Sequence, residues 1–181
     1  MSINKSMNAT NRTPQNTNFL QPTKYLLTFG KIPTIQYFCQ SANIPGVSMG
    51  SINIATPTLD IKIAGNKLSY EQFEVEFILD EAIQSWTELY KWLLAFASPK
   101  SLDSRANHMN TQNGTTKYLD NYSEATLTVL SALNNPLFRI NYHKIFPVSV
   151  SGIQFDVKNS ADTIITAKAT FAYEYFDITT A

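Results

Sequence analysis

The chain of 181 residues is poor in the residue types that most active sites require. It has one cysteine, Cys39, which excludes an internal disulfide, and two histidines, His108 and His143. The six glycines are isolated, so no glycine-rich phosphate loop is present. No apolar run near the N-terminus is long enough for a signal peptide or a membrane span. We therefore expect a protein that folds in a reducing cytoplasm and has no membrane partner.

The chain also has no excess of positive or negative charge. The 14 lysines and arginines balance the 14 aspartates and glutamates, which gives a formal net charge of +0. Proteins that grip nucleic acids or anionic membranes carry a basic surface, so those classes are disfavoured. A neutral surface protects poorly against self-association, and 44% hydrophobic residues suffice for the core of a single domain.

The sequence predicts neither catalysis nor a metal or other cofactor. There is no G-x-S-x-G elbow, and Cys39 forms no recognisable nucleophile and base pair with His108 or His143. No C-x-x-C or D-x-D cluster supplies metal ligands. Asp80 and Glu81 have the composition of an acid/base pair, but the start of a helix explains both residues without chemistry.

The stretch 71–97 changes its hydrophobic period in the middle. Every second residue from Phe73 to Leu79 is apolar, and the residues between them are Glu74, Glu76 and Ile78, which is typical of a strand with one apolar face. From Ala82 to Ala97 the apolar residues recur at helical spacing. Asp80 stands at the expected N-cap, and Pro99 ends the helix. The stretch predicts one strand that runs into one amphipathic helix.

The remaining segments alternate in the way that favours antiparallel strands. Pro57 either lies in a turn between two strands or kinks one long strand. Gly152, inside a strand pattern, indicates a bulge. The expected strands span 24–29, 34–40, 49–55, 59–64, 125–131, 137–143, 148–155 and 164–178, with turns at 30–33, 64–67, 134–136 and 145–147.

Two polar segments flank or interrupt this pattern. Residues 1–17 contain almost no large apolar side chain, so we expect a flexible arm that is either disordered or ordered against a neighbouring subunit. Residues 98–121 form a polar loop of unusual length, and such loops often make functional contacts. Residues 18–181 are then expected to be a single β domain that carries this long loop.

The order of the segments resembles the tail tube proteins of contractile-tailed bacteriophages. The likeness covers most of the chain from Asn18 onward. The segments that carry it are NFLQPTKYLLTF, FCQSANIPGV, ATPTLDIKIAGNKLSYEQFEVEFILDEA, LYKWL, ATLTVL, FPVSVSGIQFD and ATFAYEYFDI.

This resemblance implies a mainly β fold with one amphipathic helix, in which two antiparallel sheets pack into a barrel-like tail tube domain. It also implies a structural virion protein whose copies close hexameric rings that stack around a DNA conduit. The expected partners are further copies of the chain, the tail sheath, the baseplate, and DNA that passes through the lumen without specific binding. The expected location is the virion tail, after synthesis in the host cytoplasm.

Candidate functional residues follow from the two-faced strands and from the loop. A neutral or acidic lining lets DNA slide, so the predicted channel-facing residues are Glu74, Glu76, Thr170 and Glu174. The same carboxylates are equally compatible with a face in bulk solvent. Exposed strand edges recruit other strands. The predicted contacts between subunits are Phe19, Leu20, Leu59, Ile61, Ile63, Arg105 and Tyr118.

Two alternatives remain open. The long arm and loop also suit a specialised ring, either a baseplate initiator or a terminator at the head-proximal end of the tube. A monomeric β-sandwich that presents the loop 98–121 to a glycan or a protein is the other class. Self-association into rings favours the first class, and a strict monomer that binds a ligand favours the second.

Overall fold

The computed structural model describes residues 18–97, 121–156, 158 and 163–180. The predicted arm 1–17 and nearly all of the predicted loop 98–121 lie outside the described residues. The elements are β1 (Tyr25–Phe29), α1 (Pro33–Phe38), β2 (Cys39–Ala42), β3 (Val47–Ala55), β4 (Asp60–Tyr70), β5 (Phe73–Ile78), α2 (Gln84–Phe96), β6 (Ser123–Leu130), β7 (Pro136–Val150), β8 (Thr166–Ala172) and β9 (Tyr175–Thr180).

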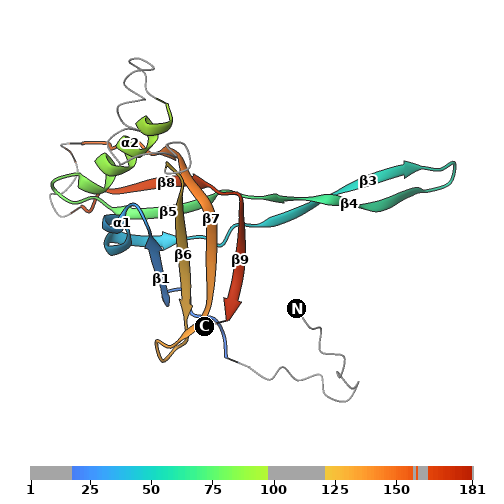
Figure 1. Ribbon diagram of the computed structural model, residues 1–181, viewed down its shortest axis with the longest axis horizontal. Coiled ribbons are helices and arrows are strands. Elements are labelled where there is room, and N and C mark those ends of the chain that lie inside the picture. The colour runs from blue at the N-terminus through green and yellow to red at the C-terminus, as the bar shows by residue number, and fades with distance from the viewer. Residues whose placement is uncertain (1–17, 98–120, 157, 159–162, 181) are drawn as a thin grey trace, which may run out of the picture.

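Two antiparallel sheets share the long strand β7 (Figure 1). In the first sheet, β1, β6, the N-terminal part of β7 and β9 lie side by side in that order. In the second sheet, the C-terminal part of β7 is followed by β8, β5 and β2. Lys144 has a φ of 50° at the junction, and this left-handed backbone lets one strand turn from one sheet into the other. The predicted arrangement of two packed antiparallel sheets is confirmed.

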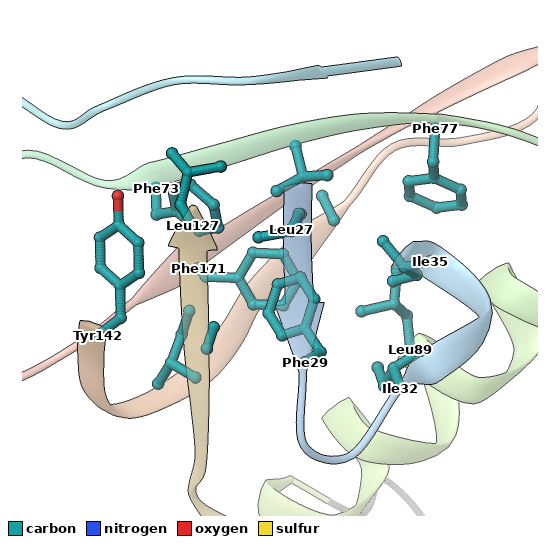
Figure 2. Close-up of a cluster of buried hydrophobic side chains, with 14 of the residues drawn as sticks. Leu27, Phe29, Ile32, Ile35, Phe73, Phe77, Leu89, Leu127, Tyr142 and Phe171 are labelled. Atoms are coloured by element: carbon teal, nitrogen blue, oxygen red, sulfur yellow. The ribbon is translucent and has the colours of Figure 1, made fainter. Parts of the chain in front are cut away.

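The core fills the space between the two sheets. Phe73 stacks on Tyr142 with ring centroids 4.5 Å apart, and Phe29 lies 5.0 Å from Phe171 (Figure 2). These rings come from both sheets, and Phe73, Tyr142 and Phe171 are fully buried. Burying a large apolar side chain is worth roughly 1.5–3 kcal/mol, so this aromatic cluster is a main source of stability.

The predicted strand and helix of residues 71–97 are confirmed as β5 and α2. Helix α2 begins at Gln84, and Ile83 occupies the cap position with a φ of 53°. Asp80 nevertheless performs the predicted role, because its Oδ1 accepts from the backbone N–H of Gln84 at 3.0 Å. Trp92 is buried on the inner side of the helix and donates from Nε1 to the carbonyl oxygen of Asn121 at 2.7 Å. Among the described residues, no helix is long and apolar enough to cross a membrane.

The expected strand at 34–40 is wrong, because residues 33–38 form the second helix, α1. Pro33 stands in the first turn, where its missing N–H costs nothing. Ile35 is fully buried, and the Thr34 hydroxyl donates to a carboxylate oxygen of Glu88 on α2. Contacts with the longer helix thus override the strand propensity of this segment.

The C-terminal strands have other boundaries than expected. The predicted turn at 145–147 lies inside β7, where Pro147 is tolerated because β8 is the only described strand that pairs with this part of β7. The expected strand 164–178 is divided between β8 and β9, because the chain crosses between sheets near Glu174. Gly152 lies beyond the end of β7, so the expected bulge within a strand is wrong. The turn at 134–136 is confirmed, and Asn134 has a φ of 62°.

The β3–β4 hairpin extends away from the two sheets as a long two-stranded arm (Figure 1). The alternative in which Pro57 lies in a turn between two strands is confirmed. The turn expected at 64–67 is wrong, because these residues belong to β4 opposite a register shift in β3. A Cβ at Gly65 would lie 2.4 Å from the carbonyl oxygen of Gly50, so the two backbones approach too closely for any other residue at 65.

Candidate assembly surfaces

The β3–β4 arm carries an apolar face that the described part of the chain leaves uncovered. Ile52 lies opposite Ile63, and Ile54 lies opposite Ile61, so these four side chains share one face. They are 61%, 46%, 45% and 49% exposed, respectively. The other face of the same stretch is polar or small. It comprises Ser51, Asn53, Asp60, Lys62 and Ala64.

An isolated two-stranded hairpin is marginally stable in water. Contiguous exposed apolar side chains on such a ribbon also mark an interaction site. The isoleucine face therefore has the character of an interaction surface, and no described residue of the chain covers it.

The base of the arm is fixed to the body. The ring of Tyr70 lies 5.9 Å from Tyr173 and 5.5 Å from Phe176. The backbone N–H of Glu71 donates to the carbonyl oxygen of Gly46 at 3.0 Å. Its side chain accepts from the N–H of Gly46 at 3.1 Å. These contacts fix the base of the arm to the two sheets.

A second apolar surface lies where the described chain begins. Phe19 and Leu20 are 95% and 57% exposed, and Leu133 in the β6–β7 turn is 82% exposed. Together with Leu137 and Phe138 they line a cavity of about 420 Å³. The predicted contact residues Phe19 and Leu20 are thus brought together with a turn that lies far away in the sequence.

The predicted channel residues do not all lie on one surface. Glu74 is directly opposite Thr170, and Glu76 accepts from the Thr166 hydroxyl at 3.0 Å, so these residues share the outward face of β5 and β8. Lys168 stands opposite Glu76 on the same face, which keeps its net charge small. Glu174 lies instead at the bend between β8 and β9, where it pairs with Lys144 Nζ at 2.6 Å.

The first sheet presents a hydrogen-bonded polar face. The Thr126 hydroxyl donates to Asn141 Oδ1 at 3.1 Å, and Asn141 Nδ2 donates to Asp177 Oδ2 at 3.4 Å. His143 Nε2 lies 2.6 Å from the other oxygen of Asp177, and the imidazole stacks on Tyr175. The hydrogen bond from His143 lowers the pKa of Asp177, with a further contribution from Asn141. His143 is a polar strand residue in this network.

Cys39 lies beside an open cleft along β1. Its Sγ is 3.8 Å from the hydroxyl of Tyr25, and the cleft between β1, α1 and β2 has a volume of about 320 Å³. Burial raises the pKa of Tyr25 to about 12, with smaller contributions from Cys39. Burial also raises the pKa of the Cys39 thiol, the opposite of what a thiolate nucleophile requires. Within the described residues, no group of three or more His, Cys, Asp or Glu side chains could hold a metal ion.

Sequence reasoning identified only one strand of the arm. Leu59, Ile61 and Ile63 were predicted as contacts between subunits and are exposed on the arm, whereas Ile52 and Ile54 on the same arm were missed. The apolar alternation of residues 49–55 carried the signal, but only the pairing of β3 with β4 shows that the isoleucines share one face. Arg105 and Tyr118 lie outside the described residues.

The comparison with protein families establishes the family to which this chain belongs. Residues 3–179 match the family model described as phage tail tube protein. The chain belongs to the phage tail tube protein family. It is thus a structural protein of the tail tube type, and the resemblance inferred from the order of its segments is confirmed.

One curated relative is a tail tube terminator protein. The chain is 27% identical over 142 residues to the tail tube terminator protein of Enterobacteria phage T4, covering 77% of this chain and 75% of the relative.

Solved structures share the fold. A chain of the anti-feeding prophage cap, described as a tube terminating cap, has a TM-score of 0.62 at 14% identity, covering 97% of this chain and 100% of the other. A chain of the sheath-tube complex of an extracellular contractile injection system, PVC, has a TM-score of 0.60 at 13% identity, covering 91% and 94%. At these identities the likeness concerns the fold alone.

Proposed function

We propose that this protein forms the ring that terminates a bacteriophage tail tube. The observation that carries this proposal is the isoleucine face of the β3–β4 arm, which is held in place at its base and is left exposed by the described residues. The similarity to the T4 tail tube terminator supports a position at the end of the tube rather than along its length. Six copies would close the ring, in keeping with the hexameric rings implied by the tube family.

The arm explains how such a ring would bind. Its apolar face would bind a second subunit, either within the ring or in the adjoining tube ring, because the described residues of one protomer leave this face exposed. Tail sheath and baseplate proteins are further proposed partners, because similar folds occur in a sheath-tube complex and in the baseplate of the anti-feeding prophage. The assembled protein would lie in the virion tail, with a structural role and no catalysis.

The outward face of β5 and β8 is our candidate for the channel lining. Glu74, Glu76 and Thr170 present carboxylates and a hydroxyl, and Lys168 is the one cation paired opposite them. A surface of this kind does not hold the DNA backbone by counterion release, which a conduit must avoid. Glu174 belongs to this proposal only as a residue of the sheet corner, because it is paired with Lys144.

Labelled protein and tail tubes test the position in the tail. Tubes assembled without this protein are mixed with the gold-labelled chain and examined by negative-stain electron microscopy. We expect label at one end of each tube and rings of six copies in the free protein. Label along the whole length would instead identify the repeating tube subunit, the second candidate, which the match to a sheath-tube complex favours. A monomer that binds no tube would reject both and favour the binding module.

A further inference from the structure

The cavity of about 420 Å³ at one end of the first sheet is apolar and open. It lies between residues 18–21 and the β6–β7 turn, and no acidic or basic side chain is among the described residues that line it. Phe19, Leu20, Leu133 and Leu137 on its walls are each at least 41% exposed. Contiguous exposed apolar side chains of this kind mark a binding site for another apolar surface.

Hydrogen bonds hold the walls of this cavity together. The N–H of Leu130 donates to the carbonyl oxygen of Lys24 at 2.9 Å, and the N–H of Lys24 donates to the carbonyl oxygen of Gln21 at 3.3 Å. The ammonium of Lys24 donates to Asn134 Oδ1 in the β6–β7 turn at 2.7 Å. The cavity is therefore preformed, and a positive charge lies at its rim.

The tip of the β3–β4 arm has the complementary character. Leu59 is 70% exposed and directly precedes β4, so by alternation its side chain lies on the same face as Ile61. The Thr56 hydroxyl donates to the carbonyl oxygen of Leu59 and accepts from its N–H at 3.2 Å. The next residue, Asp60, is exposed. The tip is thus a fixed apolar protrusion with a negative charge beside it.

Size and reach allow this tip to enter the cavity of another copy. A dry cavity of about 150 Å³ holds a benzene-sized group, so the larger cavity admits Leu59 together with part of the isoleucine face. β4 has 11 residues, and at roughly 3.3 Å per residue it extends about 36 Å. Figure 1 shows the arm extending away from the second sheet, whereas the β6–β7 turn lies at the far end of the first sheet. The tip therefore lies away from the cavity of its own chain.

We propose that the arm of one copy inserts Leu59 into the cavity beside Phe19 and Leu133 of the next copy, with Asp60 facing Lys24. The two surfaces differ, so the contact is heterologous, and such contacts close rings when the rotation between copies allows it. The charge pair at the rim orients the approach and speeds association more than it adds affinity. This inference rests on the proposed ring and names the surface that receives the arm.

Crosslinking tests the insertion. In a Cys39→Ser background, Leu59→Cys with Leu133→Cys places one thiol on the tip and one on the wall of the cavity. We expect oxidation to give a ladder of covalent oligomers on a denaturing gel, because each copy contributes one thiol to each of two contacts. Leu59→Cys with Tyr37→Cys is the matched control, since Tyr37 is 84% exposed and Leu133 is 82% exposed, and it should give no ladder. Dimers alone from the first pair would overturn the heterologous contact.

A charge reversal tests the orientation of the contact. We expect Asp60→Lys to slow assembly about fivefold at low salt, because it places two cations together at the rim. Adding Lys24→Asp should restore the rate to within twofold of the unmodified protein. Adding Lys158→Asp instead changes the net charge equally at an exposed position outside the cavity, and it should restore nothing. Equal rescue by both second substitutions would refute the pairing of Asp60 with Lys24.

The occupant of the cavity and the proposed function can fail separately. A photoreactive benzoylphenylalanine in place of Leu133 should crosslink to a second copy of the chain, and a crosslink only to the tube subunit would overturn the insertion. Rings that label tube ends but give no ladder from the Leu59 and Leu133 pair would also overturn it while leaving the proposed function intact. A ladder from a protein that never labels tube ends would support the insertion and refute the proposed function.

Discussion

The β3–β4 arm and the first sheet are built from the same kind of strand and reach opposite outcomes. In β6, Ala125, Leu127 and Val129 alternate with polar residues and are at most 5% exposed. In the arm, Ile52 and Ile54 alternate in the same way and remain about half exposed. The comparison shows that alternation specifies a two-faced ribbon, and that the tertiary structure decides whether the apolar face is covered.

The largest effect on folding is expected in the core. Phe73→Ala removes a ring that contacts Phe29, Tyr142 and Phe171, and it should lower the free energy of unfolding by about 3–5 kcal/mol. Ile54→Ala in the arm should lower it by less than about 0.5 kcal/mol, because that side chain buries little within one copy. Urea denaturation of the monomer measures both. Equal losses would contradict the division into body and arm.

Substitutions in the arm should weaken assembly strongly, although they hardly affect folding stability. Ile54→Asp with Ile61→Asp puts two charges on the apolar face of the arm. We expect binding to tube ends or to other copies to weaken by roughly 30- to 1000-fold, the cost of losing a central contact of about 2–4 kcal/mol. Asn53→Asp with Lys62→Asp, on the other face of the same strands, is the matched control. Quantitative electron microscopy of tube ends gives the ratio, and equal losses would show that the isoleucine face is not the contact.

The two glycines of the arm provide a sharper comparison. Gly65→Ala places a Cβ against the backbone of Gly50 and must shift the ribbon, whereas no atom lies within 4 Å of the corresponding position at Gly50. We expect Gly65→Ala to weaken assembly by about tenfold and Gly50→Ala to weaken it by less than about twofold. The thermal midpoint of the monomer should hardly change in either variant. A loss of stability in Gly65→Ala comparable to that of a core substitution would mean that the arm folds cooperatively with the body.

The outward face of the second sheet is expected to affect function without affecting assembly. Glu74→Lys with Glu76→Lys should slow DNA release from assembled particles by about threefold at low salt, since added cations hold phosphate, and the effect should vanish at high salt. Glu81→Lys with Glu124→Lys changes the net charge equally at other exposed positions. Equal slowing by both pairs would argue against β5 and β8 as the channel lining.

The smallest effect concerns acid stability of the polar network on the first sheet. The pKa of Asp177 is lower in the folded chain than its ordinary value of 3.8, so its ionised form favours the folded state. This contribution is complete above the ordinary value and disappears as the pH falls through the lower folded value. Asp177→Asn should therefore lower the thermal midpoint slightly at neutral pH and approach the unmodified protein near pH 3. A difference that grows toward acid pH would contradict this assignment.

Much of the fold could be read from the sequence where a period was long and uninterrupted. The switch at residues 71–97 predicted β5 and α2, and Asp80 supports the helix start as expected. Segment 34–40 could not be predicted, because its short run of apolar residues fits either period and contacts with α2 favour the helix. The bend at Lys144 could not be predicted from the sequence either, because a single residue with positive φ redirects β7 without interrupting its alternation.

The candidate assembly surfaces could also be predicted only in part from the sequence. Leu59, Ile61 and Ile63 could be chosen from alternation, but their partners on β3 depended on the register of the hairpin. The cavity beside Phe19 and Leu133 depends on which segments meet at the end of the first sheet. No local pattern encodes that meeting.

The sequence by itself determined the neutral charge, the two-faced strands, the amphipathic helix and the family likeness, because these depend on residue types and on their spacing along the chain. Only the tertiary structure decided which apolar faces are buried within one copy and which are left exposed. Burial depends on how residues far apart in the sequence are brought together, and in this chain the arm formed by β3 and β4 and the cavity beside Leu133 keep apolar side chains exposed.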